Sequence, residues 1–301
     1  MRRSAIVMPG GIFNGIEARR RKSMKLYFLS TAFASVPKGL FVSGAPWKSV
    51  CFPILSFLIE KDGELILFDT GMGGRINDEM KPLKYRHNWF FNKFVMKTEF
   101  DPGRDPVVKQ LPRLGLDPNS VRHIILSHLH WDHAGGIHDF PNAEIIVGKK
   151  EWEAATAKNS HRHAYIREQY ERIDPSRLRL ISTVSGKKCL TFPDSCDVFG
   201  DGGFVMIDLP GHTEGLMGLL LTMPSGRRFL LGGDSFYFPE NLESKSPKSK
   251  LMKKLVHEQD EADRTIEKLY DLMMKEQSLE MVGCHDHRIP GRFNLAPEYY
   301  D

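Results

Sequence analysis

The sequence of 301 residues has few cysteines, no long apolar run and little net charge. Its four cysteines show neither a disulfide framework nor a Cys-x-x-Cys pair, which favours a reducing, cytoplasmic location. No stretch reaches the roughly 18 uninterrupted apolar residues of a membrane-spanning helix. The 42 basic and 38 acidic residues leave a formal net charge of +4, and much of that excess lies before Met24. We therefore expect neither a membrane span nor a nucleic-acid partner.

Three histidines and an aspartate are concentrated in residues 127–133, which read Ser-His-Leu-His-Trp-Asp-His and follow the apolar run 121–126. Neutral imidazoles and carboxylates are the ligands that zinc and similar divalent ions prefer. If a strand ends near residue 126, His128 and His130 point the same way. The following turn can then bring Asp132 and His133 toward a second position nearby. The segment therefore predicts half of the ligands of two metal ions.

Four more polar side chains come directly after strand-like apolar runs. They are His212 after 204–207, Asp234 after 228–231, His285 after 279–282, and Asp69 after 65–68. Open α/β sheets collect such residues at the edge where their strands end. These side chains can therefore converge with residues 127–133, although they are far apart in the chain.

Together with Phe68-Asp69-Thr70-Gly71, these residues resemble the metallo-β-lactamase superfamily from Met24 onward. Within it, the chain is most similar to the N-acyl homoserine lactonases, the quorum-quenching lactonases. That narrower likeness rests on segments 24–28, 69–72, 127–136, 283–286 and 297–300, on the spacing of His212 and Asp234, and on Tyr237 three residues after that aspartate. The resemblance implies an αβ/βα sandwich, in which two mixed β-sheets are flanked by helices.

The resemblance also implies two divalent metal ions per chain, with Zn²⁺ as the expected ion, although Fe, Co or Mn can use the same ligand set. The implied ligands are His128, His130 and His212 for one ion, Asp132, His133 and His285 for the other, and Asp234 as a bridge. Asp69 is expected to orient a ligand loop rather than to bind metal. Cys284 precedes His285 at the end of a predicted strand, so its side chain should point away from the site and pack.

The implied reaction opens the lactone ring of N-acyl homoserine lactones by attack of a metal-bridging hydroxide. In that reaction Asp132 relays a proton to the leaving alkoxide, and the Tyr237 hydroxyl stabilises the oxyanion. A thioester hydrolase of the glyoxalase II type has the same seven ligands. Such enzymes usually carry a basic C-terminal region for a glutathione carboxylate, whereas only Arg288 and Arg292 follow His285 here. The same bimetal site also fits another ester or phosphoester hydrolase, or a metal-binding protein without turnover.

The spread of candidate ligands from 128 to 285 favours a single hydrolase domain over 24–301, because two independent domains would not share one bimetal centre. Residues 1–23 show no strand or helix periodicity and are expected to be a disordered or non-native extension. Strands are predicted at 24–31, 52–60, 64–68, 121–126, 144–148, 189–192, 203–209, 216–222, 227–232 and 279–283, and helices at 105–114, 149–173 and 255–276. This order predicts two mixed sheets between helices, with the metals at one edge.

Residues 72–106 form an aromatic-rich insertion, which contains Tyr85, Trp89, Phe90, Phe91, Phe94 and Phe100 among lysines, arginines and prolines. One interpretation is a helix packed on its own core or a homodimer contact. The other is an apolar wall for the tail of a small-molecule lactone or ester, because aromatic side chains commonly line pockets. The stretch Phe41 to Phe52, with Trp47, is a candidate for the same wall.

Overall fold

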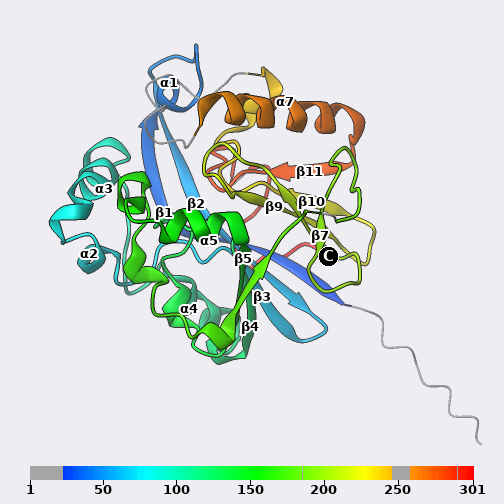
Figure 1. Ribbon diagram of the computed structural model, residues 1–301, viewed down its shortest axis with the longest axis horizontal. Coiled ribbons are helices and arrows are strands. Elements are labelled where there is room, and N and C mark those ends of the chain that lie inside the picture. Colours follow the sequence, from blue (N-terminus) through cyan, green and yellow to red (C-terminus); the bar gives the residue numbers. More distant parts are fainter. Residues whose placement is uncertain (1–22, 185, 246–257, 290) are drawn as a thin grey trace, which may run out of the picture.

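The computed structural model describes residues 23–301, apart from 185, 246–257 and 290. Two mixed sheets face each other, and each is covered by helices on its outer side (Figure 1). This is the αβ/βα sandwich that the sequence predicted. None of the helices within the described residues has the length and apolar character needed to cross a membrane.

The first sheet has six strands in the order β1-β2-β3-β4-β5-β6. Their bounds are β1 Met24–Pro37, β2 Ser49–Lys61, β3 Glu64–Phe68, β4 Val121–Ile125, β5 Glu144–Gly148 and β6 Leu178–Ile181. The first three strands pair antiparallel, whereas β3 to β6 run parallel. Parallel neighbours end at the same edge of a sheet, so the loops that follow β3 and β4 lie side by side.

The second sheet has five strands in the order β11-β10-β9-β8-β7. Their bounds are β7 Cys196–Asp197, β8 Phe204–Asp208, β9 Met217–Thr222, β10 Arg228–Leu231 and β11 Leu279–Val282. Strands β10 and β11 are parallel, and the other pairs are antiparallel. The carboxyl ends of β10 and β11 therefore also meet at one edge.

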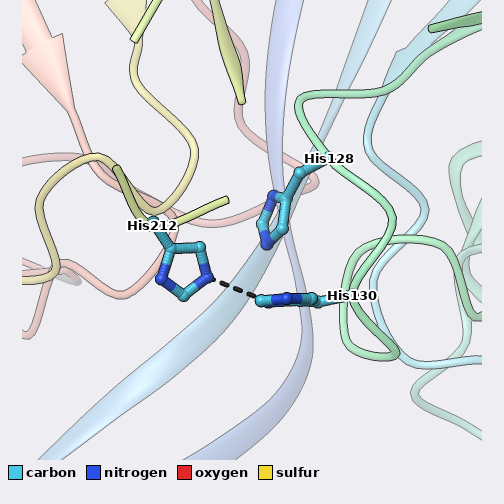
Figure 2. A group of neighbouring side chains, drawn as sticks. All are labelled: His128, His130 and His212. Atoms are coloured by element: carbon cyan, nitrogen blue, oxygen red, sulfur yellow. Dashed lines mark hydrogen bonds between the residues drawn. The ribbon is translucent and has the colours of Figure 1, made fainter. Parts of the chain in front are cut away.

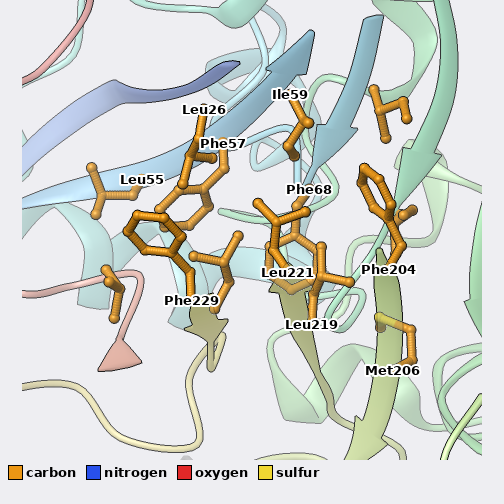
Figure 3. Close-up of a cluster of buried hydrophobic side chains, with 14 of the residues drawn as sticks. Leu26, Leu55, Phe57, Ile59, Phe68, Phe204, Met206, Leu219, Leu221 and Phe229 are labelled. Atoms are coloured by element: carbon orange, nitrogen blue, oxygen red, sulfur yellow. The ribbon is translucent and has the colours of Figure 1, made fainter. Parts of the chain in front are cut away.

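The main core lies between the two sheets, where side chains from both inner faces interdigitate (Figure 3). Alternation along each strand selects the inward residues, because successive side chains of a strand point to opposite faces. On β2, Leu55 and Phe57 enter this core, while Leu58 packs on the outer side of the sheet. Phe204 and Phe229 contribute to the core from the second sheet.

Helices cover the outer faces of both sheets. The α-helices are α1 Lys38–Phe41, α2 Ile76–Glu79, α3 Arg86–Phe90, α4 Val107–Gln110, α5 Lys149–Thr156, α6 Pro239–Glu243 and α7 Gln259–Lys275. Helices α4 and α5 contribute to the core outside the first sheet, and α6 and α7 to the core outside the second. Helices α2 and α3 project from one side of the molecule (Figure 1).

The secondary structure departs from the sequence-based prediction in several places. No strand forms over 189–192, where Leu190 has a φ of 51° and the chain turns so that Cys189 pairs with Phe192. The predicted helix over 149–173 ends at Thr156, because Ala157 is already extended, and 3-10 turns follow. Strand β6 was not predicted, since Leu178–Ile181 is short and carries an arginine.

Another predicted helix is divided, and two predictions lie partly or mostly outside the described residues. The predicted helix over 105–114 is divided into α4 and a 3-10 helix over Leu111–Leu114 that contains a proline. The beginning of the predicted helix over 255–276 lies outside the described residues. The expectation for residues 1–23 also lies outside them, except for Ser23. The Ser23 amide donates to the Asp62 carboxylate, and the Asp62 amide donates to the Ser23 carbonyl.

Candidate metal centre

The candidate ligands occupy loops that follow the ends of strands from both sheets. The loop after β4 carries His128 to His133, and the loops after β8, β10 and β11 carry His212, Asp234 and His285. All seven side chains are buried and lie at one end of the sandwich. Because each loop follows a strand fixed in a packed sheet, the backbone holds these side chains in place. The structure brings together the whole set that the sequence singled out.

A first group consists of His128, His130 and His212, whose imidazoles point toward one another (Figure 2). The ligand-capable atoms of the group lie within 4.8 Å of one another, and Nε2 of His212 is 2.9 Å from Nδ1 of His130. Burial lowers the pKa of His128 well below its ordinary value and that of His130 to about 3. Both imidazoles are therefore neutral and keep the lone pairs that a metal ion requires.

A second group consists of Asp132, His133 and His285, again with ligand-capable atoms within 4.8 Å of one another. Asp234 lies between the two groups. Its Oδ2 is 3.3 Å from Nε2 of His212, in the first group. Its Oδ1 is 3.2 Å from Nε2 of His285 and 3.3 Å from Nε2 of His133, in the second. One carboxylate therefore presents one oxygen to each group, which is the geometry that a bridging ligand needs.

The donor set fits divalent cations. Nε2 of His128 is buried and has no hydrogen-bond partner among the described residues, and Nε2 of His133 faces the Asp234 carboxylate 3.3 Å away. The other ring nitrogens are engaged, because Nδ1 of His128 lies 2.9 Å from the Ser127 hydroxyl and Nδ1 of His133 lies 2.9 Å from Asp69. Buried polar atoms normally have a partner. A metal-ligating imidazole is typically held by a hydrogen bond at one ring nitrogen and presents the other ring nitrogen to the ion.

Charge in the second group also favours a cation. Burial lowers the pKa of His133, but the carboxylates of Asp234 and Asp69 outweigh it and raise that pKa well above the ordinary value. Burial raises the pKa of Asp234, but His285 and His133 outweigh it and lower that pKa well below its ordinary value. The site therefore holds a positive charge beside its carboxylates, and a metal ion can replace the proton that supplies it.

Asp69 lies beneath the site and fixes the loop after β4. Its carboxylate accepts hydrogen bonds of 2.7 Å from both the amide and the hydroxyl of Ser127, and it contacts the ring of His133. Cys284 packs in the core between the sheets, as predicted, but the prediction that it points away from the site was wrong, because its Sγ lies 3.7 Å from Asp69. Strand β11 ends at Val282, so the alternation of a strand does not extend to residue 284. Burial raises the pKa of the Cys284 thiol to about 12, which keeps it protonated.

Glu151 supports the first group, and sequence reasoning missed it. This fully buried carboxylate on α5 accepts hydrogen bonds from the Leu129 amide (2.8 Å), the Tyr165 hydroxyl (3.0 Å) and the Thr213 hydroxyl (2.7 Å). Leu129 lies between two candidate ligands, and Thr213 follows a third. The close approach requires Gly215, since a Cβ there would lie 2.0 Å from the Glu151 nitrogen. A glutamate in a polar helix ordinarily faces solvent, so the sequence gives little signal for this role.

Tyr237 lies at the edge of the first group. Its hydroxyl oxygen is 3.1 Å from Nδ1 of His212, and its ring stacks on Phe41 with 4.5 Å between centroids. Burial, and then the charges of Asp234 and Asp132, raise the pKa of the phenol well above its ordinary value. The hydroxyl therefore keeps its proton at neutral pH. Its contact with a candidate ligand was not predicted from the sequence.

A cavity of about 730 Å³ opens above these residues. Its floor includes His130, Asp132, His212, Asp234, Tyr237 and His285, and its walls and mouth are formed by Phe41, Leu83, Arg86, His87, Asn88, Phe90, Phe91, Val95, Met96, Trp131 and Ala164. The insertion over 72–106 therefore supplies much of the wall. Phe41 contributes as expected, whereas Trp47 is 63% exposed and does not line the cavity.

Comparison with known proteins identifies the superfamily to which this chain belongs. Residues 50–267 match the metallo-beta-lactamase superfamily, so the chain belongs to that superfamily. It is similar to the N-acyl homoserine lactonase AttM of Rhizobium radiobacter, with 32% identity over 194 residues, which cover 64% of this chain and 68% of the relative. It is also similar to the N-acyl homoserine lactonase AiiA of Bacillus thuringiensis subsp. kurstaki, with 28% identity covering 91% of this chain and 98% of the relative.

A solved structure supports the same placement. It is that of an N-acyl homoserine lactone hydrolase with the product N-hexanoyl-L-homoserine bound at its catalytic metal centre. The likeness has a TM-score of 0.71 and 27% identity, and it covers 92% of this chain and 98% of the other. The resemblance predicted from the sequence is thus confirmed, both for the superfamily and for the lactonases within it.

Proposed function

We propose that this chain is a hydrolase with two divalent metal ions that opens the lactone ring of N-acyl homoserine lactones. The observation that supports it most directly is the placement of the seven candidate ligands. They lie together, and five of them (His130, Asp132, His212, Asp234 and His285) line the floor of an apolar-walled cavity, in a chain whose relatives are N-acyl homoserine lactonases. The four cysteines are free, which agrees with the cytoplasmic location that we propose.

We assign one ion to His128, His130 and His212, and the other to Asp132, His133 and His285, with Asp234 shared between them. Two such ions, with Zn²⁺ as the expected pair, supply a water of lowered pKa and a Lewis acid for the substrate carbonyl. The cavity leaves room above them for the ring of a substrate, while Asp69 and Glu151 hold the ligand loops from below.

Tyr237 is placed to donate a hydrogen bond to the substrate. When Nε2 of His212 acts as a ligand, the ring proton resides on Nδ1 and can be donated to the Tyr237 oxygen 3.1 Å away. We assign the phenol hydrogen to an oxygen of the substrate in the cavity, which Tyr237 lines. A donor fixed at that position stabilises negative charge as it develops on a carbonyl oxygen.

Asp132 is the candidate for proton transfer to the leaving alkoxide. It lines the cavity, and its Oδ2 lies 3.7 Å from Nε2 of His285. A carboxylate at the cavity floor, beside the space for the substrate, is suited to receive a proton and pass it to the leaving oxygen.

A glyoxalase II-type thioester hydrolase has less support. The Arg288 guanidinium forms ion pairs with Glu240 and Glu243. Arg292 donates to the Met281 carbonyl and lies 3.4 Å from Asp286. Both basic residues after His285 are thus engaged with this chain's own oxygen atoms and do not line the cavity. The apolar walls favour a substrate with an apolar tail over a glutathione conjugate.

A substrate panel tests the proposal. The metal-loaded protein should open N-hexanoyl homoserine lactone with a kcat/KM at least about a hundredfold above that for a glutathione thioester or an aryl phosphoester, a margin of about 2.7 kcal/mol. Comparable or faster turnover of the thioester or the phosphoester would contradict the proposed substrate class, while leaving the assignment of a metallo-hydrolase intact.

A further inference from the structure

Residues 80–98 combine positive charge with exposed aromatic rings. We call this stretch the basic aromatic segment. It contains five lysines and arginines, five aromatic residues and no aspartate or glutamate. It includes α3 and the π-helical turn Phe91–Val95, and it projects from one side of the molecule near α2 (Figure 1).

Large apolar side chains of this segment are exposed to solvent. Leu83 is 82% exposed, and Trp89, Phe90 and Phe94 are 38%, 55% and 52% exposed. The rings form one cluster, because the centroid of Phe94 is 5.7 Å from that of Trp89 and 5.1 Å from that of Phe90. Contiguous exposed rings of this kind mark an interaction surface rather than ordinary surface composition.

Cations lie beside these rings. Lys81 and Lys84 form ion pairs with Asp78 and Glu168. In the part of the chain that the structure describes, Arg86, Lys93 and Lys97 form no ion pair. The Lys93 ammonium lies 5.3 Å from the centre of the Trp89 ring. Exposed cations next to exposed Trp and Phe are the combination that binds the interface of an anionic bilayer.

A second copy of the chain fits this surface less well. A two-fold contact through the segment would bring ten lysines and arginines together with no carboxylate from either copy of the segment. Like charges across an interface oppose association. A flat, negatively charged lipid surface offers complementary charge, and the peripheral position of α3 lets it approach without hindrance from the two sheets (Figure 1).

We propose that the basic aromatic segment docks this protein on anionic membrane surfaces. Trp89 and Phe94 insert at the level of the lipid headgroups, and Lys93 and Lys97 contact lipid phosphates. Leu83 and Phe90 belong both to this segment and to the mouth of the cavity. Docking therefore places the cavity mouth at the lipid surface. The proposal concerns binding and does not depend on which bond the protein hydrolyses.

Vesicle co-sedimentation of the full chain tests this proposal without any substrate. The protein should bind vesicles of phosphatidylglycerol and phosphatidylcholine, should not bind vesicles of phosphatidylcholine alone, and should be released by added salt. The double variant Lys93→Gln/Lys97→Gln should bind about thirtyfold more weakly. The matched control Lys268→Gln/Lys275→Gln, on the exposed face of α7, should bind like the parent.

A second variant tests the aromatic part. Trp89→Ser/Phe94→Ser should lose most of the vesicle binding, with a circular dichroism spectrum and metal content like the parent's, since neither side chain lines the cavity. Absence of binding to the anionic vesicles by the parent, or equal binding to both kinds of vesicle, would overturn the proposal. Equal losses of vesicle binding in the Lys93→Gln/Lys97→Gln variant and in the α7 control would also overturn it. The proposal would also be overturned if the parent binds no vesicles and instead forms a dimer that the Trp89→Ser/Phe94→Ser change dissociates. A second copy of the chain would then be the partner of this surface.

Discussion

Replacement of Tyr237 by phenylalanine isolates the contribution of one hydroxyl group. The ring stacks on Phe41 with 4.5 Å between centroids, and phenylalanine preserves that contact. The change removes only the oxygen that lies 3.1 Å from Nδ1 of His212. Because Nδ1 is not the nitrogen that faces Asp234, we expect both metal ions to remain bound.

Two effects set the expected magnitude of the Tyr237→Phe change. Loss of the hydrogen bond to His212 should lower the free energy of unfolding by about 1 kcal/mol. Loss of a principal oxyanion donor typically slows a reaction by about 10²–10³-fold. In the proposed site two cations share that task, so we expect kcat to fall about tenfold, or about 1.4 kcal/mol in the barrier. Because the phenol pKa is raised well above its ordinary value, the ratio of parent to variant should stay constant across neutral pH.

The assay measures the opening of N-hexanoyl homoserine lactone by parent and variant at saturating substrate, with the metal content of each sample determined in parallel. Tyr165→Phe is a poor control because that hydroxyl contacts Glu151, whereas Tyr299→Phe changes an exposed hydroxyl far from the site. Turnover by Tyr237→Phe equal to that of the parent, at equal metal content, would refute a role for this hydroxyl in the reaction.

Three other changes test separate parts of the site. Asp234→Ala should abolish turnover and release at least one metal ion per chain, and retention of both ions with activity would contradict the bridging assignment. Glu151→Gln should accelerate the loss of metal to a chelator about tenfold, whereas Glu153→Gln, a change at an exposed residue of the same helix, should not. Equal rates of metal loss in the two variants would show that Glu151 does not support the metal site. Deletion of residues 1–23 should leave metal content and turnover nearly unchanged, and a large fall in either would show that the segment contributes to the folded body.

The convergence of the candidate ligands could be predicted from the sequence because the signal is local. Each candidate ligand follows an apolar run that forms a strand, and the ends of packed parallel strands meet. His128 and His130 lie two residues apart and do converge, together with His212. The same local reasoning predicted that Asp69 would hold a ligand loop, and it accepts hydrogen bonds from Ser127.

Features that depend on distant contacts, on the end of a strand or on an unusual backbone angle could not be predicted in this way. Glu151 acts through the packing of α5 against loops at residues 129 and 213, and nothing near it in the sequence shows that its carboxylate is buried. Cys284 faces Asp69 because β11 ends at Val282, one residue before the predicted end of the strand, so the alternation of side chains does not reach residue 284. The strand predicted over 189–192 does not form because Leu190 adopts a positive φ, which a leucine residue does not predict.

Titration of the metal-free protein with Zn²⁺, while the opening of N-hexanoyl homoserine lactone is followed, tests the central claim most directly. We predict no detectable turnover after chelation and a rise in activity that reaches its maximum when two ions are bound per chain, since the two ligand groups share Asp234. Full activity in the chelated protein, a maximum at one bound ion, or a metal-loaded protein with two ions that leaves the lactone closed would contradict the account.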